Sequence, residues 1–186
     1  MINLNNIMIN NIFNKTLAFF IILIIMPVLI LIAFLSFIIN GLPITYTAQR
    51  VGLNEMKFII YKFRTMGVHT KSVDNKYSLF LRKTNLDELL QFFNILKGDM
   101  SIVGPRPHDL DEDIYFKKNI DDYYKRYKVK PGVTGWAAVN GNRGGNNLKV
   151  ISERVKYDLD YIEKKSILFD IKIILKTIKL IFFPNH

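Results

Sequence analysis

The hydrophobic and polar positions divide the chain into three parts with different patterns. Residues 17–39 form an apolar run without a charged side chain, residues 41–166 mix polar and apolar positions, and residues 167–183 return to a mostly apolar pattern. A run of that length and hydropathy indicates insertion into a membrane. The sequence therefore predicts an N-terminal membrane-inserted segment over residues 1–40 and a folded domain over residues 41–186.

Pro27 lies near the middle of the apolar run and leaves two modes of insertion open. A straight helix over this run would be about 35 Å long, enough to cross a hydrocarbon core of about 30 Å. A break at Pro27, which lacks a backbone N–H, would leave arms of about 15 and 20 Å that enter the membrane and return. From the residues alone a kinked spanning helix is favoured. A cleaved signal peptide fits poorly because the run is too long and no small-residue cleavage site follows it.

The folded domain shows patterns of both strands and helices. Residues 43–52 and 57–66 carry β-branched and aromatic side chains on either side of a turn-like GLNE, which predicts a hairpin. Residues 67–83 are polar and predict a loop. Asn85 and Glu88 have the spacing of a capping box, so we expect a helix from Asn85 to Leu96 that ends at Lys97–Gly98. The other expected elements are a helix over 109–128, a glycine- and asparagine-rich loop over 130–147 and a helix over 152–163.

The C-terminal segment combines apolar residues with a basic stripe. Lys172, Lys176 and Lys179 recur at helical spacing within residues 167–183. This pattern is typical of a helix that lies among lipid headgroups. A core helix with a solvated lysine face is the alternative, and the apolar surface beside the stripe favours the membrane. The predicted fold class is therefore α+β and mainly helical, with a membrane helix, a small hairpin and amphipathic interfacial helices.

Composition and charge narrow the classes of function. The chain has 186 residues and a formal net charge of +10, and before residue 40 Lys15 is the only charged side chain. The excess of Lys and Arg after the apolar run places the domain on the cytoplasmic side. The absence of cysteine excludes thiolate metal sites and catalytic thiols, and three histidines at unrelated spacings make a histidine-built site improbable. The positive charge favours an anionic partner, but no nucleic-acid-binding motif accompanies it.

Two adjacent acids, Asp87 and Glu88, stand at the start of the expected central helix. Acids in a first turn commonly complement the helix dipole, and this structural interpretation is the ordinary one. Here a further acid and an arginine between two prolines follow within a few residues, in GDMSIVGPRP. A carboxylate at a helix N-terminus remains ionised and can bind Mg²⁺ or attack phosphorus. The pair is therefore a candidate catalytic site.

Arginines accompany the acidic pair along the chain. Arg64, Arg106 and Arg143 offer guanidinium groups suited to bidentate contacts with phosphate. Arginines and a divalent ion are what a diphosphate substrate needs, because its own charge repels an anionic nucleophile. No GxxxxGK[ST] motif is present, so a P-loop enzyme is not supported.

Four segments in this order resemble the bacterial sugar transferases: KFRTM, LDELLQFFNILKGDMSIVGPRP, KPGVTGWAAVNG and YDLDYIEKKSILFDIKIILKT. These are monotopic phosphoglycosyltransferases that start glycan assembly on a polyprenol phosphate in the bacterial inner membrane. The resemblance covers nearly the whole chain after residue 15 and corresponds to the minimal catalytic form. It implies transfer of a phosphosugar from a UDP-sugar to undecaprenyl phosphate with release of UMP.

The resemblance also implies roles for individual residues. Asp87 resembles the nucleophile that forms a covalent phosphosugar intermediate, and Glu88 matches the second acid, with both expected to bind Mg²⁺. Arg64 and Arg106 match family arginines for which phosphate binding is expected, as it is for Lys62. The family's membrane segment re-enters the cytoplasmic leaflet, which reverses the preference for a spanning helix drawn from the residues alone.

The chain departs from the family pattern at several positions. Ala48 and Ala138 stand where the family usually has glutamine, and Met26 stands where serine often precedes the membrane proline. Arg143 lies one position later than the usual arginine of the NGR motif. A catalytically weak or inactive membrane scaffold of the same fold is therefore the alternative function. Neither the sugar nor the oligomeric state follows from the sequence.

Overall fold

The computed structural model describes residues 4–67, 72, 75–142, 144–145 and 147–183. The elements follow one another as α1 Leu4–Asn40, β1 Thr45–Val51, η1 Leu53–Glu55, β2 Lys57–Phe63, α2 Lys76–Thr84, η2 Leu86–Glu88, α3 Gln91–Lys97, β3 Ser101–Val103, α4 Leu110–Asn119, η3 Tyr123–Lys128, β4 Gly132–Thr134, α5 Trp136–Val139, α6 Leu148–Lys164 and α7 Ile167–Phe182. Helices dominate, with two small sheets, so the expected mainly helical α+β class is confirmed.

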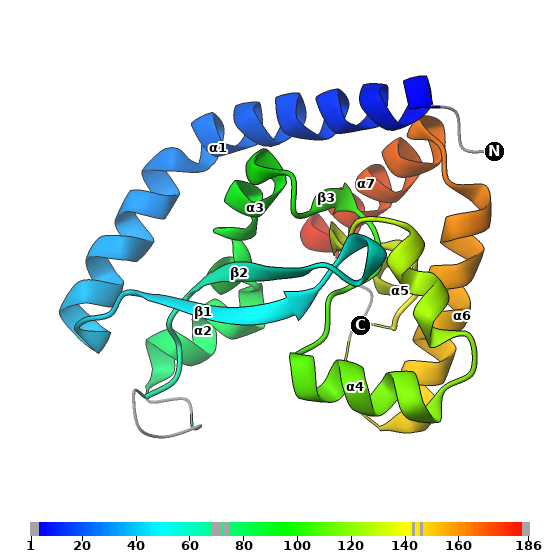
Figure 1. Ribbon diagram of the computed structural model, residues 1–186. Helices are drawn as coiled ribbons and strands as arrows, with labels where there is room; N and C mark the ends of the chain where they lie inside the picture. Colours follow the sequence, from blue (N-terminus) through cyan, green and yellow to red (C-terminus); the bar gives the residue numbers. More distant parts are fainter. Residues whose placement is uncertain (1–3, 68–71, 73–74, 143, 146, 184–186) are drawn as a thin grey trace.

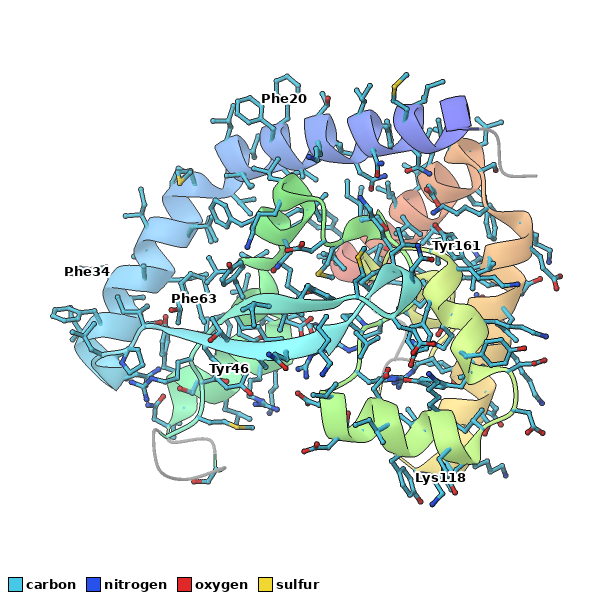
Figure 2. All side chains as sticks on the ribbon, viewed as in Figure 1. Phe20, Phe34, Tyr46, Phe63, Lys118 and Tyr161 are labelled. Carbon is cyan, nitrogen blue, oxygen red and sulfur yellow. The ribbon has the colours of Figure 1, made fainter. Side chains whose placement is uncertain are left out.

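Helix α1 is long and apolar enough to cross a membrane by length and composition over Met8–Asn40. It continues through Pro27 as one helix, and in Figure 1 it arches over the other elements and changes direction in its middle. One side of α1 packs on the domain along most of its length, through buried Ala18, Ile22, Leu29 and Ile32. Side chains on the other side, such as Phe20 and Phe34 in Figure 2, are exposed.

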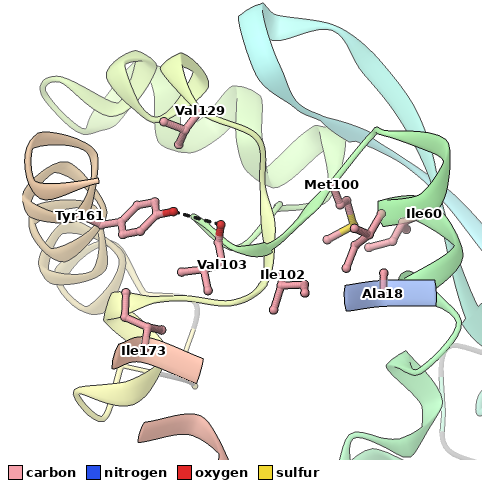
Figure 3. Close-up of a cluster of buried hydrophobic side chains, with 9 residues drawn as sticks. Ala18, Ile60, Met100, Ile102, Val103, Val129, Tyr161 and Ile173 are labelled. Atoms are coloured by element: carbon pink, nitrogen blue, oxygen red, sulfur yellow. Dashed lines mark hydrogen bonds between the residues drawn. The ribbon is translucent and has the colours of Figure 1, made fainter. Parts of the chain in front are cut away.

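The main core joins elements that are distant in sequence. Ala18 of α1, Ile60 of β2 and Ile95 of α3 meet residues of β3, α6 and α7 there. Figure 3 shows Tyr161 of α6, whose hydroxyl donates to the carbonyl of Val103 at 3.2 Å. This core fixes β3, and therefore the segment that follows it, against the helices.

The hairpin prediction is confirmed. Strands β1 and β2 pair antiparallel in a register that places Tyr46 opposite Lys62 and Arg50 opposite Phe58. Paired residues of a sheet point to the same face, so Tyr46 and Lys62 share one face of the hairpin. The second sheet pairs β3 with β4 in parallel, with Ser101 opposite Gly132.

The predicted loop over residues 67–83 is wrong in its second half, because α2 begins at Lys76, and residues 68–71 and 73–74 lie outside the described residues. The side chain of Asn75 accepts a hydrogen bond from the backbone N–H of Ser78, which caps the helix. Tyr77 and Leu81 turn the apolar side of α2 toward α1. This part of the segment carries the apolar and aromatic residues Tyr77, Leu79, Phe80 and Leu81, so treating the whole of 67–83 as polar was the error.

The predicted capping box at Asn85 is also wrong. Asn85 ends α2 in the left-handed conformation, with φ 56°, and its backbone N–H donates to the carbonyl of Arg82. The chain then forms the 3-10 turn η2 before α3. The expected end of the helix at Lys97–Gly98 is confirmed, since Gly98 closes α3 with φ +95°.

Three further boundaries differ from the predictions. The helix expected over 109–128 is divided into α4 and η3, and the loop expected over 130–147 contains β4 and α5. Helix α6 starts at Leu148 because the side chain of Asn147 accepts from the N–H of Val150. The expected C-terminal helix is confirmed as α7.

Candidate active site

The turn η2 carries both acids and is held by its apolar neighbours. Leu86 and Leu89, on either side of Asp87 and Glu88, pack on a buried cluster that includes Leu29 of α1. Asp87 and Glu88 are themselves buried, at 8% and 9% exposure. Burying two adjacent acids is costly unless charges or hydrogen bonds compensate them. The positions of the neighbouring cations therefore decide what each acid can do.

Glu88 is bound by two cations from different parts of the fold. Arg106 donates to both of its carboxylate oxygens, at 2.6 and 3.1 Å, and Lys62 Nζ donates to Oε1 at 2.6 Å. Burial alone would raise the pKa of Glu88, but the hydrogen bonds and charges of Arg106 and Lys62 lower it to about 2. Glu88 is therefore a fixed anion that orients both cations.

Asp87 has a different environment. Burial and the adjacent charge of Glu88 raise its pKa, against the opposing charges of Lys62 and Arg82. The Asp87 carboxylate accepts from its own backbone N–H, but among the described residues no side chain donates a hydrogen bond to it. The two neighbouring acids are thus shifted in opposite directions, and Asp87 is the one whose oxygens remain available to a ligand.

Arg106 reaches Glu88 because its backbone is tightly held. The chain after β3 passes so close to β4 that a Cβ on Gly104 would lie 2.3 Å from the carbonyl oxygen of Lys130. Gly132 then donates its N–H to the carbonyl of Pro105 at 3.0 Å. These contacts explain the glycines of VGPRP and KPGVTG. The Arg106 side chain is still 47% exposed, so part of it remains open to a ligand.

A buried polar network supports the Arg106 segment from behind. Arg126 donates to the carbonyl of Arg106 at 2.7 Å and to Asp158 at 2.8 Å, and its Nη1 lies 3.2 Å from His108 Nδ1. Burial, followed by the charges of Arg126 and Arg154, lowers the pKa of His108 to about 2. His108 is therefore a neutral structural partner at ordinary pH.

The other predicted arginines lie away from the acidic pair or outside the described residues. Arg64 is buried, and its guanidinium donates to the backbone carbonyls of Asn40, Gly41, Pro43 and Met66. These contacts give it a structural role at the end of α1, and they offer no support for its predicted phosphate binding. Arg143 lies outside the described residues.

Sequence reasoning missed several buried polar residues near the site. Arg154 donates to the carbonyls of Asn142 and Gly144 and approaches His108 Nε2, so it joins the glycine-rich loop to the segment after β3. Arg50 is buried and ion-paired with Asp109, across an isolated bridge between the two residues. The only sequence signal for Arg126 and Arg154 is that each arginine lies on a segment with apolar neighbours.

Mg²⁺ was expected at the acidic pair, and the donor set fits it in part. Within the described ranges no group of three or more acidic, histidine or cysteine side chains is arranged to hold a metal. Both oxygens of Glu88 already accept from cations, which leaves Asp87 as the available carboxylate. Mg²⁺ is often held by one or two carboxylates together with substrate phosphates, and Asp87 fits that mode.

Comparison with known proteins adds independent information. The model of the family described as bacterial sugar transferase matches residues 5–184. The UDP-glucose:undecaprenyl-phosphate glucose-1-phosphate transferase of Xanthomonas campestris pv. campestris is 44% identical over 148 residues, which cover 73% of this chain and 31% of the relative. The protein of the same name from Escherichia coli K12 is 42% identical over 174 residues, which cover 87% of this chain and 38% of the relative.

A relative with a different sugar in its name is also similar. The UDP-N-acetylgalactosamine-undecaprenyl-phosphate N-acetylgalactosaminephosphotransferase of Aeromonas hydrophila is 35% identical over 151 residues, covering 75% of this chain and 35% of the relative. The chain thus spans about a third of the length of these relatives. Because the family model matches almost the whole sequence, the chain belongs to the bacterial sugar transferase family.

Proposed function

We propose that the protein transfers a phosphosugar from a UDP-sugar to polyprenol phosphate, with undecaprenyl phosphate as the expected acceptor. The observation that carries this proposal is the asymmetry of the acidic pair: Glu88 is bound by Arg106 and Lys62, whereas the more basic Asp87 is left available. Family membership and the names of the relatives support the substrate classes. Those names differ in their sugar, so the proposal stops at a UDP-sugar.

In the first step, an oxygen of Asp87 attacks the sugar-linked phosphorus of the donor. The bond between that phosphorus and the bridging oxygen breaks, UMP leaves, and a phosphosugar remains on the carboxylate. In the second step, a phosphate oxygen of polyprenol phosphate attacks the same phosphorus. The bond to Asp87 then breaks, which releases the polyprenyl diphosphosugar and regenerates the carboxylate.

The cations beside Glu88 would stabilise the phosphates during both steps. Arg106 keeps an exposed part from which it can contact a diphosphate, and Lys62 adds a second positive charge. Arg143, in the glycine-rich loop, remains a third candidate for phosphate binding. Bound through Asp87 and the diphosphate, Mg²⁺ would supply charge neutralisation at the reacting phosphorus.

We place the protein in the bacterial inner membrane with the domain on the cytoplasmic face and α1 as a re-entrant helix. Both halves of α1 dock on the same domain: Asn14 Oδ1 accepts from the N–H of Ile102, and Ser36 Oγ lies 3.0 Å from the hydroxyl of Tyr77. A spanning orientation would separate the N-terminal half from the domain and leave these polar groups in lipid.

Helix α7 would contact the leaflet beside α1. Its exposed side chains include Leu168, Leu175 and Phe182, with the exposed Lys172 and Lys179 beside them. Lys176 differs from the predicted pattern, because its Nζ lies 4.7 Å from the centre of the Trp136 ring. The apolar side with flanking lysines supports an interfacial position.

The alternative function, an inactive membrane scaffold, makes the opposite prediction about product formation. The deciding experiment incubates the purified protein with undecaprenyl phosphate and one UDP-sugar at a time, either UDP-glucose or UDP-N-acetylgalactosamine. The released UMP is measured in each reaction. Release of UMP that depends on both Asp87 and the acceptor supports the transferase. Absence of UMP from every tested UDP-sugar, with a folded protein, would favour the scaffold.

A further inference from the structure

Two lysines from distant parts of the chain lie beside Gly98, and a third lysine acts on one of them. A Cβ built on Gly98 would lie 3.7 Å from Nζ of Lys15 in α1 and 3.8 Å from Nζ of Lys130, which precedes β4. Lys165, directly before α7, is close enough to Lys130 for its charge to lower the pKa of Lys130. We call Lys15, Lys130 and Lys165 the lysine cluster.

The lysine cluster carries more positive charge than its surroundings neutralise. Lys130 donates to the neutral side chain of Asn11 at 2.9 Å. Burial and the charges of Lys15 and Lys165 lower the pKa of Lys130, with Asp99 as the opposing charge. Like charges held this close repel one another, so an additional anion between them would be bound favourably.

Asp170 is the second acid beside the lysine cluster, and it faces Lys165. Its carboxylate also accepts from the hydroxyl of Tyr161 at 2.8 Å and from the side chain of Asn10. Asp170 is buried at 3% exposure, whereas Lys15 is exposed. The exposed part of the lysine cluster therefore carries the positive charge, and the acid lies on its buried side.

Exposed apolar side chains flank the lysine cluster on both helices. On α1 they include Phe19 and Phe20, at 50% and 55% exposure, and on α7 they include Leu168, at 80%. Lysines that border lipid-facing apolar surface lie at the level of the headgroup phosphates. The bound anion would thus come from the membrane surface.

We propose that the lysine cluster binds the phosphate of an anionic phospholipid headgroup. A lysine ammonium binds phosphate as a point charge, and a leaflet rich in anionic lipid attracts clustered lysines. This site is separate from the Asp87–Glu88 pair and holds the protein at a fixed depth in the leaflet. The proposal rests on the membrane location proposed above and is independent of the transfer reaction.

The test uses the full-length protein purified in an uncharged detergent. Short-chain phosphatidylglycerol, short-chain phosphatidylcholine and inorganic phosphate are titrated separately, and bound lipid is measured by native mass spectrometry. We expect phosphatidylglycerol to bind more tightly than the other two. We expect the Lys15→Gln/Lys130→Gln variant to lose about fivefold in affinity for each lysine removed, about 25-fold in all.

Two matched variants control for folding and for total charge. Lys118→Gln removes one positive charge on α4, on the side of the molecule opposite to α1 (Figure 2), and should leave phosphatidylglycerol binding unchanged. Lys15→Arg/Lys130→Arg keeps both charges and should retain most of the binding. Loss of binding in the arginine pair as large as in the glutamine pair would overturn a charge-based site.

Other outcomes would also refute the proposal. Equal binding of phosphatidylcholine and phosphatidylglycerol would exclude anion recognition, and inorganic phosphate that binds as tightly as the lipid would exclude a headgroup site. Flotation with phosphatidylcholine vesicles tests the proposed membrane location separately, because a protein that does not float with them does not bind the membrane. A protein that floats with these vesicles but shows no preference for anionic lipid would refute the lysine-cluster site alone.

Discussion

The substitution Glu88→Gln tests the role of Glu88 as the fixed anion of the site. Glutamine keeps the size of the side chain and removes the charge that Arg106 and Lys62 share. The Glu88 side chain is only 11% exposed, and Lys62 is 17% exposed, so water compensates poorly for the lost charge. Removing the shared carboxylate charge leaves Lys62 largely buried without its counter-ion, whereas Arg106 keeps partial access to water.

The pKa of Glu88 sets the expected magnitude. Its lowering from 4.5 to about 2 corresponds to about 3 kcal/mol, at about 1.4 kcal/mol for each pKa unit. Because the folded-state pKa is lower than the unfolded value, this stabilisation is fully present above pH 4.5 and is lost as the pH falls through about 2. For a chain of this length, about 3 kcal/mol lowers Tm by roughly 6–12 °C.

Thermal unfolding in detergent, followed by the fluorescence of the single tryptophan, Trp136, measures this difference. The control is Glu163→Gln, which changes an exposed acid of α6 in the same way. We expect the Tm difference between wild type and Glu88→Gln to be full at pH 7 and to shrink steadily below pH 4.5. A difference that is absent at pH 7, or one that stays constant down to pH 3, would refute the assignment of Glu88 as a strongly stabilised anion.

The remaining predictions concern chemistry and topology. Asp87→Asn should lower UMP release by several orders of magnitude without loss of folding, whereas the same change at the exposed Asp111 should have little effect. Substantial phosphosugar transfer by the folded Asp87→Asn protein would contradict the covalent step. A chelator should abolish transfer and Mg²⁺ should restore it, so full activity in excess chelator argues against the ion. In this cysteine-free chain, Asn3→Cys and Lys118→Cys should both resist an impermeant maleimide until spheroplasts are opened, and labelling of Asn3→Cys alone from outside would indicate a spanning helix.

The parts of the site that could be predicted from the sequence are those that lie close together along the chain. Asp87, Glu88 and Arg106 fall within one short segment, in which α3, the turn at Gly98 and β3 separate the acids from the arginine. Lys62 was added only through the family resemblance, and its contact with Glu88 joins two separate elements. Local patterns were sufficient where one element or one turn positions the residue.

Contacts between distant segments were not predictable in the same way. Arg126 and Asp158 form a buried pair although they lie on η3 and α6, and no spacing rule connects them. The conformation of Asn85 depends on α2 ending there, which in turn depends on the packing of α2 against α1. Tertiary packing therefore overrode a local capping signal that was chemically reasonable.

Arg64 and Arg106 have the same side chain but very different hydrogen-bond acceptors. Helix α1 has no basic residue in its last turn, so its final carbonyls need donors from elsewhere, and Arg64 supplies them to Asn40 and Gly41. Arg106 lies between two prolines, which have no N–H, and its side chain meets a carboxylate while remaining 47% exposed. The N–H groups of Arg64 donate to backbone carbonyls, so few remain for a ligand. Arg106 shares Glu88 with Lys62 and stays partly exposed, so it can still donate to a substrate. These acceptors hold Arg64 at the junction of α1 with the domain and leave Arg106 the better-placed candidate for the proposed reaction.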